Sequence, residues 1–500
     1  EDIANLQDYY KREGFWRARV GSPKRIPRRG GGLDLVIPIV EGPRYIVNDI
    51  TFPDIKIFKR EELMPALSLI GNMPYSSKKM RDDIRMVRSY YGSRGYADVS
   101  VIPEVRELEG SKVDILYRIT TGTRKRVGLV NIEGNTKSQE RVIRREVPMQ
   151  PGEFYNSVDL ETTKRRLQNL GYFEDVQVTG AASSQDGYRD VNILVQEQRT
   201  GTINFGLGFS SIDRILGRIN LEQSNFDITN WGRFTGAGQR FSVNLQAGST
   251  RTDFRVSLVE PWFLGQKLSL GTDLYYRDLV FLSPEYDQRN IGASVFLRKP
   301  VGRRSYVKGE YRIETVEIEA ESDTTQAFKD EEDEYLRSAL SLNYVYDSRD
   351  SNQLPRRGHK VDLGLIYAGG LLAGDIDTIT FTGSGTKHWS LPFDAILTAR
   401  GSFAVVDSHG DNDHIPIFER QFLGGARDLR GFDFRNVGPR DDIGPNPTQE
   451  VLGGATSVFG SLELTFPVIG KVRGAVFYDA GFVNSDSWDF NTGRLASDIG

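Results

Sequence analysis

From Gly201 to the end of the chain, apolar and polar residues alternate in long segments, and this pattern constrains the fold more than any other feature. In the first segment, Ile203, Phe205, Leu207 and Phe209 alternate with polar or small residues. Such alternation places apolar side chains on one face of a β-strand and polar side chains on the other. About thirteen segments of this kind follow one another, and many reach the ten residues that a tilted membrane strand needs. We therefore expect an antiparallel transmembrane β-barrel.

Two observations favour a membrane barrel over a soluble sandwich or propeller. Strands in sandwiches are usually only about five or six residues long. The polar faces here stay polar over whole strands, as at Arg218, Asn220 and Glu222, which suits a wet lumen better than a packed core. The apolar faces of such a barrel carry aromatic girdles, and the candidates are Tyr275, Tyr276, Tyr344, Tyr346 and Trp389.

Residues 1–198 show a different pattern, a repeat of about 80 residues that appears when the chain is aligned with itself. In each copy an amphipathic helix ends at a glycine, an aromatic residue follows and a short strand begins. The glycines are Gly14, Gly95 and Gly171, and the position just past a helix end favours glycine because its backbone is left-handed. Each complete unit is predicted to run strand, helix, helix, strand, strand.

The repeats and the alternating region define the expected domains. Arrays of small α+β units present edge strands to partners, and an edge strand can accept an extended peptide by main-chain pairing. The chain starts at Glu1 without methionine, and Ser497-Asp498-Ile499-Gly500 resembles the start of a strand, so we expect more chain on both sides. The expected domains are the back half of a repeat (1–43), two complete repeats (44–121 and 122–198) and a barrel that lacks its last strands (199–500).

A long irregular segment, residues 409–454, interrupts the strands near the end of the chain. A loop of this length inside a compact fold is usually functional or disordered, and residues 418–434 are too apolar for a solvated tail. Gly424, Gly425 and Gly431 permit tight turns and close backbone approach. Arg430 is therefore predicted on a packed loop tip, where its guanidinium needs a carboxylate partner.

Two acids on the strands that follow face the polar side. Glu463 alternates with Leu462 and Leu464, and Asp479 alternates with Tyr478. An acid on the lipid face would cost a few kcal/mol near the midplane of the bilayer. We therefore place both carboxylates in the lumen.

Composition excludes several other functions. The net charge of −4 does not indicate nucleic-acid binding, and the absence of cysteine excludes a disulfide framework. We find no nucleophile elbow, phosphate-binding loop or zinc-protease motif. The local group His409, Asp411, Asp413 and His414 is interpreted as a polar loop rather than a metal site. The acidic run at residues 330–334 is interpreted as a solvated loop tip.

The ordered set of motifs resembles the BamA-type family of outer membrane protein assembly factors, whose repeats are called POTRA domains. Repeats of this kind precede a barrel, and an RGF-bearing loop stands before the last strands. The motifs, in order, are Glu260-Pro261-Trp262-Phe263, Asp347-Ser348-Arg349-Asp350, Leu429-Arg430-Gly431-Phe432 and Phe477-Tyr478-Asp479-Ala480-Gly481.

The resemblance implies a barrel of about sixteen strands in full, with the loop folded inside it. It implies a loop lock in which Arg430, Gly431 and Phe432 meet Glu463 and Asp479. It also implies a weak seam at the first barrel strand, where glycine weakens pairing. The remaining candidate residues are the loop turns Gly424, Gly425, Gly438 and Pro439, and the seam glycines Gly206 and Gly208.

The function that the resemblance implies is assembly rather than catalysis of a covalent step. The POTRA domains would bind unfolded outer-membrane β-barrel proteins in the periplasm, and the barrel would promote their folding and insertion into the bacterial outer membrane. Expected partners are periplasmic chaperones, accessory lipoproteins of an assembly complex and outer-membrane lipid. We expect no nucleic acid, metal or cofactor. Alternatives are a two-partner secretion pore, a TamA-like translocation and assembly module and, from another class, a passive porin.

Overall fold

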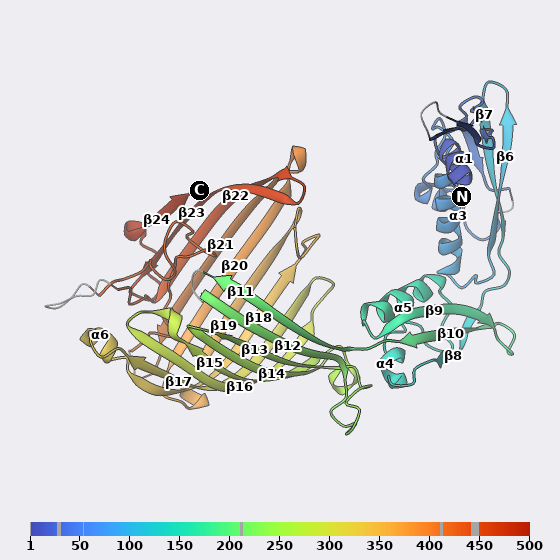
Figure 1. Cartoon of the computed structure of the whole chain (residues 1–500). Helices are drawn as coiled ribbons and strands as arrows, with labels where there is room; N and C mark the ends of the chain where they lie inside the picture. Colours follow the sequence, from blue (N-terminus) through green and yellow to red (C-terminus); the bar gives the residue numbers. More distant parts are fainter. Residues whose placement is uncertain (1, 28–31, 54, 211–213, 411–413, 442–449) are drawn as a thin grey trace. The chain divides into compact units, whose positions relative to one another are not determined.

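The computed structural model describes residues 2–27, 32–53, 55–210, 214–410, 414–441 and 450–500. The chain forms two compact units, Glu1–Arg199 and Thr200–Gly500 (Figure 1). The first unit contains small sheets and helices, and the second is a single large sheet. This division follows the change from the repeat pattern to the alternating pattern.

The first unit repeats one order of elements. The complete order, strand, helix, helix, strand, strand, occurs twice, as predicted, and in each copy the third strand lies in the middle of a three-stranded sheet and pairs in parallel with the first. The first copy contains β5 (Ile46–Thr51), α2 (Arg60–Leu63), η1 (Met64–Ala66), α3 (Ser77–Gly92), β6 (Ser100–Leu108) and β7 (Lys112–Thr120). The second contains β8 (Arg126–Glu133), α4 (Glu140–Arg144), α5 (Ser157–Asn169), β9 (Phe173–Ala182) and β10 (Tyr188–Glu197).

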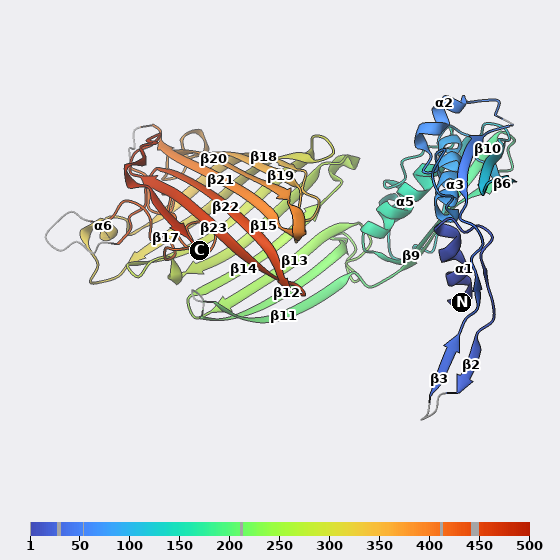
Figure 2. The same cartoon turned by 90° about the horizontal axis from the view of Figure 1, so that it is seen from above.

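The first residues of the chain supply a helix and two pairs of short strands. Strand β1 pairs with β4, and β2 pairs with β3, both antiparallel. Figure 2 shows β2 and β3 as a projecting arm of this unit. The elements are α1 (Asp2–Arg12), β1 (Arg19–Val20), β2 (Lys24–Pro27), β3 (Leu33–Val36) and β4 (Ile39–Val40).

The three repeat glycines all have left-handed backbones, with φ of 106° at Gly14, 99° at Gly95 and 71° at Gly171. Each follows a helix by two or three residues, as the repeat pattern predicts. Arg124 packs on Gly95, where an added Cβ would lie 2.6 Å from the arginine Cγ, and its Nε donates to the Arg94 carbonyl at 2.8 Å. The arginine at the start of one repeat thus satisfies a carbonyl at the helix end of the repeat before it.

A buried carboxylate distinguishes the first complete repeat from the second. Asp83, on α3, is fully buried and accepts hydrogen bonds from the Ser68 and Leu69 N–H groups and the Tyr117 hydroxyl. At the equivalent positions of the second repeat, threonine (Thr163) replaces Asp83 and proline (Pro148) replaces Ser68. Because proline has no N–H, the second repeat has one fewer donor to satisfy, and the carboxylate is replaced.

We expect Asp83→Ala to speed amide exchange in β7, because it leaves up to three buried donors without an acceptor, at about 1–3 kcal/mol for each orphaned group. Burial raises the pKa of Asp83 above its ordinary value, while the Ser68, Leu69 and Tyr117 donors oppose that shift. The folded state therefore binds this proton more tightly than the unfolded state.

The wild type should accordingly lose stability as the pH rises through the folded-state pKa of Asp83. The difference in stability between the wild type and Asp83→Ala should therefore become smaller as the pH rises. Hydrogen exchange of the full-length protein at several pH values measures both effects. Asp82→Ala, which removes the neighbouring half-exposed carboxylate, is the matched control. Equal exchange in both variants would contradict the role of Asp83.

Within its described residues, the second unit forms a 14-stranded antiparallel sheet in which each strand pairs with the next in sequence, and the sheet curls into a barrel (Figures 1 and 2). The predicted fold class is confirmed, and the strand start expected at residues 497–500 corresponds to the short strand β24. The strands are β11 (Gly201–Ser210), β12 (Arg214–Phe226), β13 (Gln239–Gly248), β14 (Arg251–Glu260), β15 (Ser269–Leu279), β16 (Tyr286–Pro300), β17 (Ser305–Ala320), β18 (Asp333–Asp347), β19 (Gly358–Ala368), β20 (Thr378–Ser390), β21 (Ile396–Ser408), β22 (Thr456–Ile469), β23 (Val472–Asn484) and β24 (Ala496–Ile499).

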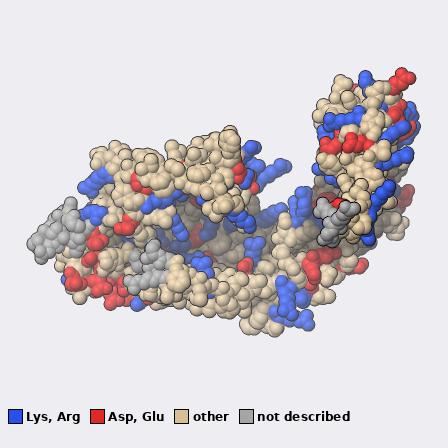
Figure 3. Space-filling model, turned by 45° about the horizontal axis from the view of Figure 1, so that its top comes forward, with Lys and Arg blue, Asp and Glu red and all other residues tan. Residues whose placement is uncertain are grey.

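The two faces of this sheet differ as the alternation predicts. Apolar side chains such as Leu462, Leu464 and Phe466 are exposed on the outer face, and Figure 3 shows lysine and arginine side chains along the hollow of the barrel.

One girdle candidate is wrong: Tyr275 is buried and donates to Glu314 at 2.8 Å. Tyr275 and Tyr276 are neighbours on one strand, so they must point to opposite faces. Among the described residues, no helix is long and apolar enough to span a membrane.

Candidate functional site

The loop between β21 and β22 folds back on itself and against the barrel wall. Leu423 and Val437 exchange main-chain hydrogen bonds of 3.1 and 2.9 Å, and Gln421 and Gly454 exchange bonds of 2.7 and 3.0 Å. These pairs close the loop tip, residues 423–437, into a compact turn. The tip carries its own backbone pairing and needs the wall only for side-chain contacts.

Arg430 projects from the loop tip onto two carboxylates of the barrel wall. Its Nε and Nη2 donate to the two Asp479 carboxylate oxygens at 2.7 and 2.9 Å, and its Nη1 contacts Glu463. The guanidinium also lies 3.4 Å from the centre of the Phe477 ring. A bidentate fork on one carboxylate with a second acid beside it is the strongest form of this contact.

Burial makes this cluster energetically costly to break. The Asp479 side chain is 0% exposed, against 18% for Arg430 and 22% for Glu463. Ser461 lies beside the guanidinium at 3.4 Å. The Arg430 cation therefore offsets the charge of two acids on the wall strands, one of which is fully buried.

Apolar side chains anchor the loop tip beside the arginine. Leu429 is fully buried and forms a cluster with Leu423 and Val437 of the loop and with Phe459 and Val483 of the wall. Phe432 packs against the same cluster. The tip therefore combines apolar burial with a charged fork.

Asp498 is a further site residue, which no sequence pattern predicts. The Gly431 N–H donates to the Asp498 carboxylate at 2.8 Å, and a Cβ on Gly431 would lie 2.7 Å from the Asp498 Cβ. The structure thus gives a reason for glycine beside Arg430. Asp498 stands in the four-residue strand β24, directly opposite Asp479, and a segment so short carries no usable alternation.

Three loop glycines are enclosed by backbone or side chains. Gly424 has φ of 114°, and a Cβ there would lie 2.3 Å from the Asp433 carbonyl oxygen. Gly425 has φ of 103° and packs against Phe434. Gly438 packs against Val451, and the Pro439 carbonyl accepts the Leu452 N–H at 2.8 Å. These predicted turn positions all lie where the loop reverses or pairs.

We expect Gly424→Ala to lower the temperature at which the barrel unfolds, because it adds both left-handed strain, roughly 1–3 kcal/mol, and a clash with main chain. Heating the folded protein before electrophoresis and scoring the mobility shift measures that temperature. Gly460→Ala is the control, because a Cβ at Gly460 of β22 would meet nothing within 4 Å. Identical unfolding of the two variants would show that the turn at Gly424 is unimportant.

The acidic run at residues 330–334 is not simply a solvated loop tip, and that interpretation is wrong for Glu331. Glu331 is 3% exposed, accepts the Ile417 N–H at 3.0 Å and pairs with Arg420. The error has a physical cause. A run of acids is usually solvated, and Arg420, the partner of Glu331, lies 89 positions away in sequence. Of the four residues His409, Asp411, Asp413 and His414, which were interpreted as a polar loop, Asp411 and Asp413 lie outside the described residues. No metal-binding group of three or more side chains occurs within the described ranges.

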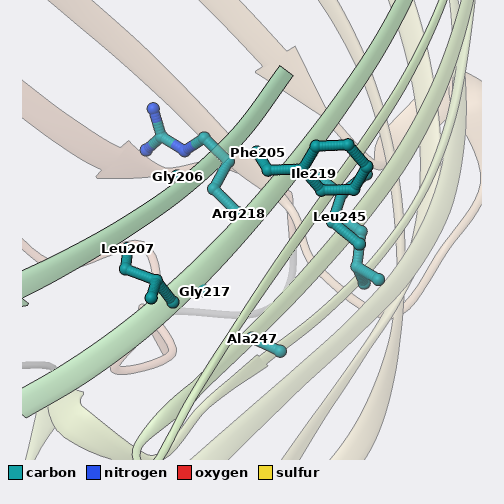
Figure 4. A pocket seen from close by; sticks show the side chains of 8 residues that line it. All are labelled: Phe205, Gly206, Leu207, Gly217, Arg218, Ile219, Leu245 and Ala247. Carbon is teal, nitrogen blue, oxygen red and sulfur yellow. The ribbon is translucent and has the colours of Figure 1, made fainter. Parts of the chain in front are cut away.

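The predicted seam glycines, Gly206 and Gly208, lie in β11 at one end of the sheet, whereas the acids of the loop site lie on β22 and β23 near the other end. A Cβ on either would meet nothing within 4 Å. A hollow of about 550 Å³ lies beside Gly206, lined by Phe205, Leu207, Gly217, Arg218, Ile219, Leu245 and Ala247. Figure 4 shows Phe205, Ile219 and Leu245 on one side and Arg218 pointing away from them.

The fold and the site define a class: POTRA-type repeats followed by a β-barrel whose long loop carries an arginine onto acids of the wall. The model of the Omp85 superfamily domain matches residues 233–498, and the POTRA model, described as a surface antigen variable number repeat, matches residues 45–122 and 125–198. The chain therefore belongs to the Omp85 superfamily. Such a barrel lies in the bacterial outer membrane, with its POTRA domains in the periplasm.

Proteins similar to this chain are named outer membrane protein assembly factor BamA. The protein from Nitratidesulfovibrio vulgaris is 26% identical over 98% of this chain and 61% of its own length. The Neisseria meningitidis protein is 24% identical over 98% of this chain and 63% of its own length. The chain thus spans about three fifths of these relatives. The crystal structure of Haemophilus ducreyi BamA lacking POTRA domains 1–3 has the same fold, with a TM-score of 0.73, 22% identity and 88% coverage of both chains.

Proposed function

We propose that the whole protein promotes folding and insertion of β-barrel proteins into the outer membrane. The observation that supports this most is the combination of a repeat array with a barrel whose loop tip binds Glu463 and Asp479 through Arg430. The assembly-factor names of the relatives that match 98% of the chain support the same function. No energy source is needed, because folding of the client is downhill and only its barrier must fall.

The repeats and the barrel take different parts in this proposal. The domains are residues 1–43, 44–121, 122–198 and 199–500, and the two complete repeats offer edge strands β6 and β9 to extended precursors. Periplasmic chaperones, accessory lipoproteins and outer-membrane lipid are the proposed partners. Arg430, with Gly431 and Phe432, holds the loop against the wall. Gly206 and Gly208 weaken the first strand at the seam.

Folding of small unrelated barrel proteins into liposomes tests this function. The full-length protein is reconstituted, and client folding is followed by the shift in gel mobility. We expect faster folding of several unrelated clients than in empty liposomes. Export of one specific partner without any acceleration would overturn the proposal in favour of a secretion pore.

A further inference from the structure

The root of the loop, residues 415–422, packs on a different part of the wall from the tip. Ile417 is fully buried in a cluster with Tyr286 of β16, Val316 and Ile318 of β17, and Phe328. Phe418 of the root contacts Tyr335 of β18, with ring centres 5.4 Å apart. The tip contacts β22, β23 and β24, which strands β19 to β21 separate in the sheet from the strands that the root contacts. Arg435 of the tip also lies 5.9 Å from the centre of the Tyr286 ring of β16.

A buried charge cluster holds the root on its wall. Arg337 of β18 contacts Glu419 of the root through Nε and Glu314 of β17 through Nη1 at 3.2 Å. The side chains are 10%, 8% and 6% exposed. Glu314 also accepts from Tyr275 at 2.8 Å and from Asn290 at 3.4 Å. Every member is hydrogen-bonded, so the cluster holds Glu419 in one position.

The adjacent residue makes a second charged contact in the same region. Arg420 pairs with Glu331, whose other oxygen accepts the Ile417 N–H at 3.0 Å. Arg420 also donates to the Ile415 carbonyl at 2.8 Å and to the Leu452 carbonyl at 3.3 Å. The root is therefore tied both to the wall and to the returning end of the loop.

We propose that Arg337 and Glu419 are positioning residues for Arg430, and that the loop is a strut joining two separate parts of the barrel wall. Holding the root fixes Glu419 and Arg420 a short distance along the chain from Arg430, so it limits where the guanidinium can lie. Fixing one end of a flexible segment raises the effective concentration of the other end at its site. The effect on activity rests on the function proposed above, whereas the effect on loop position does not.

Hydrogen exchange of the full-length protein in lipid nanodiscs tests loop position directly. We expect Glu419→Gln to speed exchange of tip amides, such as those of Gly425 and Val437, by about tenfold or more, since a charged hydrogen bond at the root is lost. Glu317→Gln is the matched control, because Glu317 of β17 pairs with Arg289 at 2.8 Å and both side chains are over 40% exposed. Unchanged exchange at the tip in Glu419→Gln would overturn the proposal.

A second measurement separates positioning from general stability. We expect Glu419→Gln to slow client folding in the wild type and to cause no further loss in an Arg430→Ala background, because it acts through the arginine. An equal further loss in both backgrounds would overturn the inference while leaving the assembly function intact. If Glu419→Gln yields no folded protein, Arg337→Lys, which keeps the charge but loses the fork, replaces it in both experiments.

Discussion

Arg430→Ala is expected to lower the unfolding temperature of the barrel more than any other single change in the loop tip. The change leaves the fully buried Asp479 and the adjacent Glu463 without their cation. Removing one partner of a buried ion pair costs about 3–5 kcal/mol, and the contact with the Phe477 ring is lost as well. The gel-mobility shift on heating gives the unfolding temperature of the variant and of the wild type.

Controls for this prediction come from the same loop and the same wall. Arg427→Ala removes an exposed arginine three positions away and should change little, because exposed charges contribute at most about 1 kcal/mol. Asp479→Asn should mimic Arg430→Ala, since it removes the charge that the fork binds. Unfolding of both Arg430→Ala and Asp479→Asn at the wild-type temperature would refute the loop lock.

Arg337→Met is the second change for which we expect a large loss of stability. It leaves two buried carboxylates, Glu314 and Glu419, side by side without a cation, again at about 3–5 kcal/mol for the broken buried cluster. Adding Glu314→Gln and Glu419→Gln to Arg337→Met should recover much of the loss, because the stranded charges disappear. The unfolding temperature of each variant measures the effect.

Arg289→Met on β16, two strands from Arg337, serves as the control, because its partner Glu317 is exposed and the pair is screened by solvent. The decisive comparison is between Arg337→Met and the triple variant that also carries Glu314→Gln and Glu419→Gln. If the triple variant unfolds at the same temperature as Arg337→Met, then lost packing rather than stranded charge explains the destabilisation.

Much of the fold could be predicted because its signals are local. Alternation places Glu463 and Asp479 on the lumen side, and the helix-ending glycines mark the repeats without any tertiary information. The loop is predicted by its length and its apolar content. Each of these signals lies within a short stretch of chain, so a single sequence suffices to read it.

The remaining contacts depend on residues distant in sequence. Arg337 and Glu419 are 82 positions apart, and no local pattern links them. Glu331 belongs to an acidic run that looks solvated until Arg420 is placed beside it. Asp498 lies in a strand of four residues, too short for periodicity. Tyr275 is a different case, because alternation alone puts it on the opposite face from Tyr276. These contacts arise from how the wall and the loop meet, which a one-dimensional pattern does not encode.

A double-mutant cycle on client folding tests the central claim most directly. The rates at which reconstituted wild type, Arg430→Ala, Asp479→Asn and the double variant fold a small barrel protein are compared. Because the two residues act through one contact, we predict that each single change slows client folding and that the double variant is no slower than Arg430→Ala alone. Additive losses, or wild-type rates in all three variants, would contradict an assembly factor that works through a loop held by this arginine.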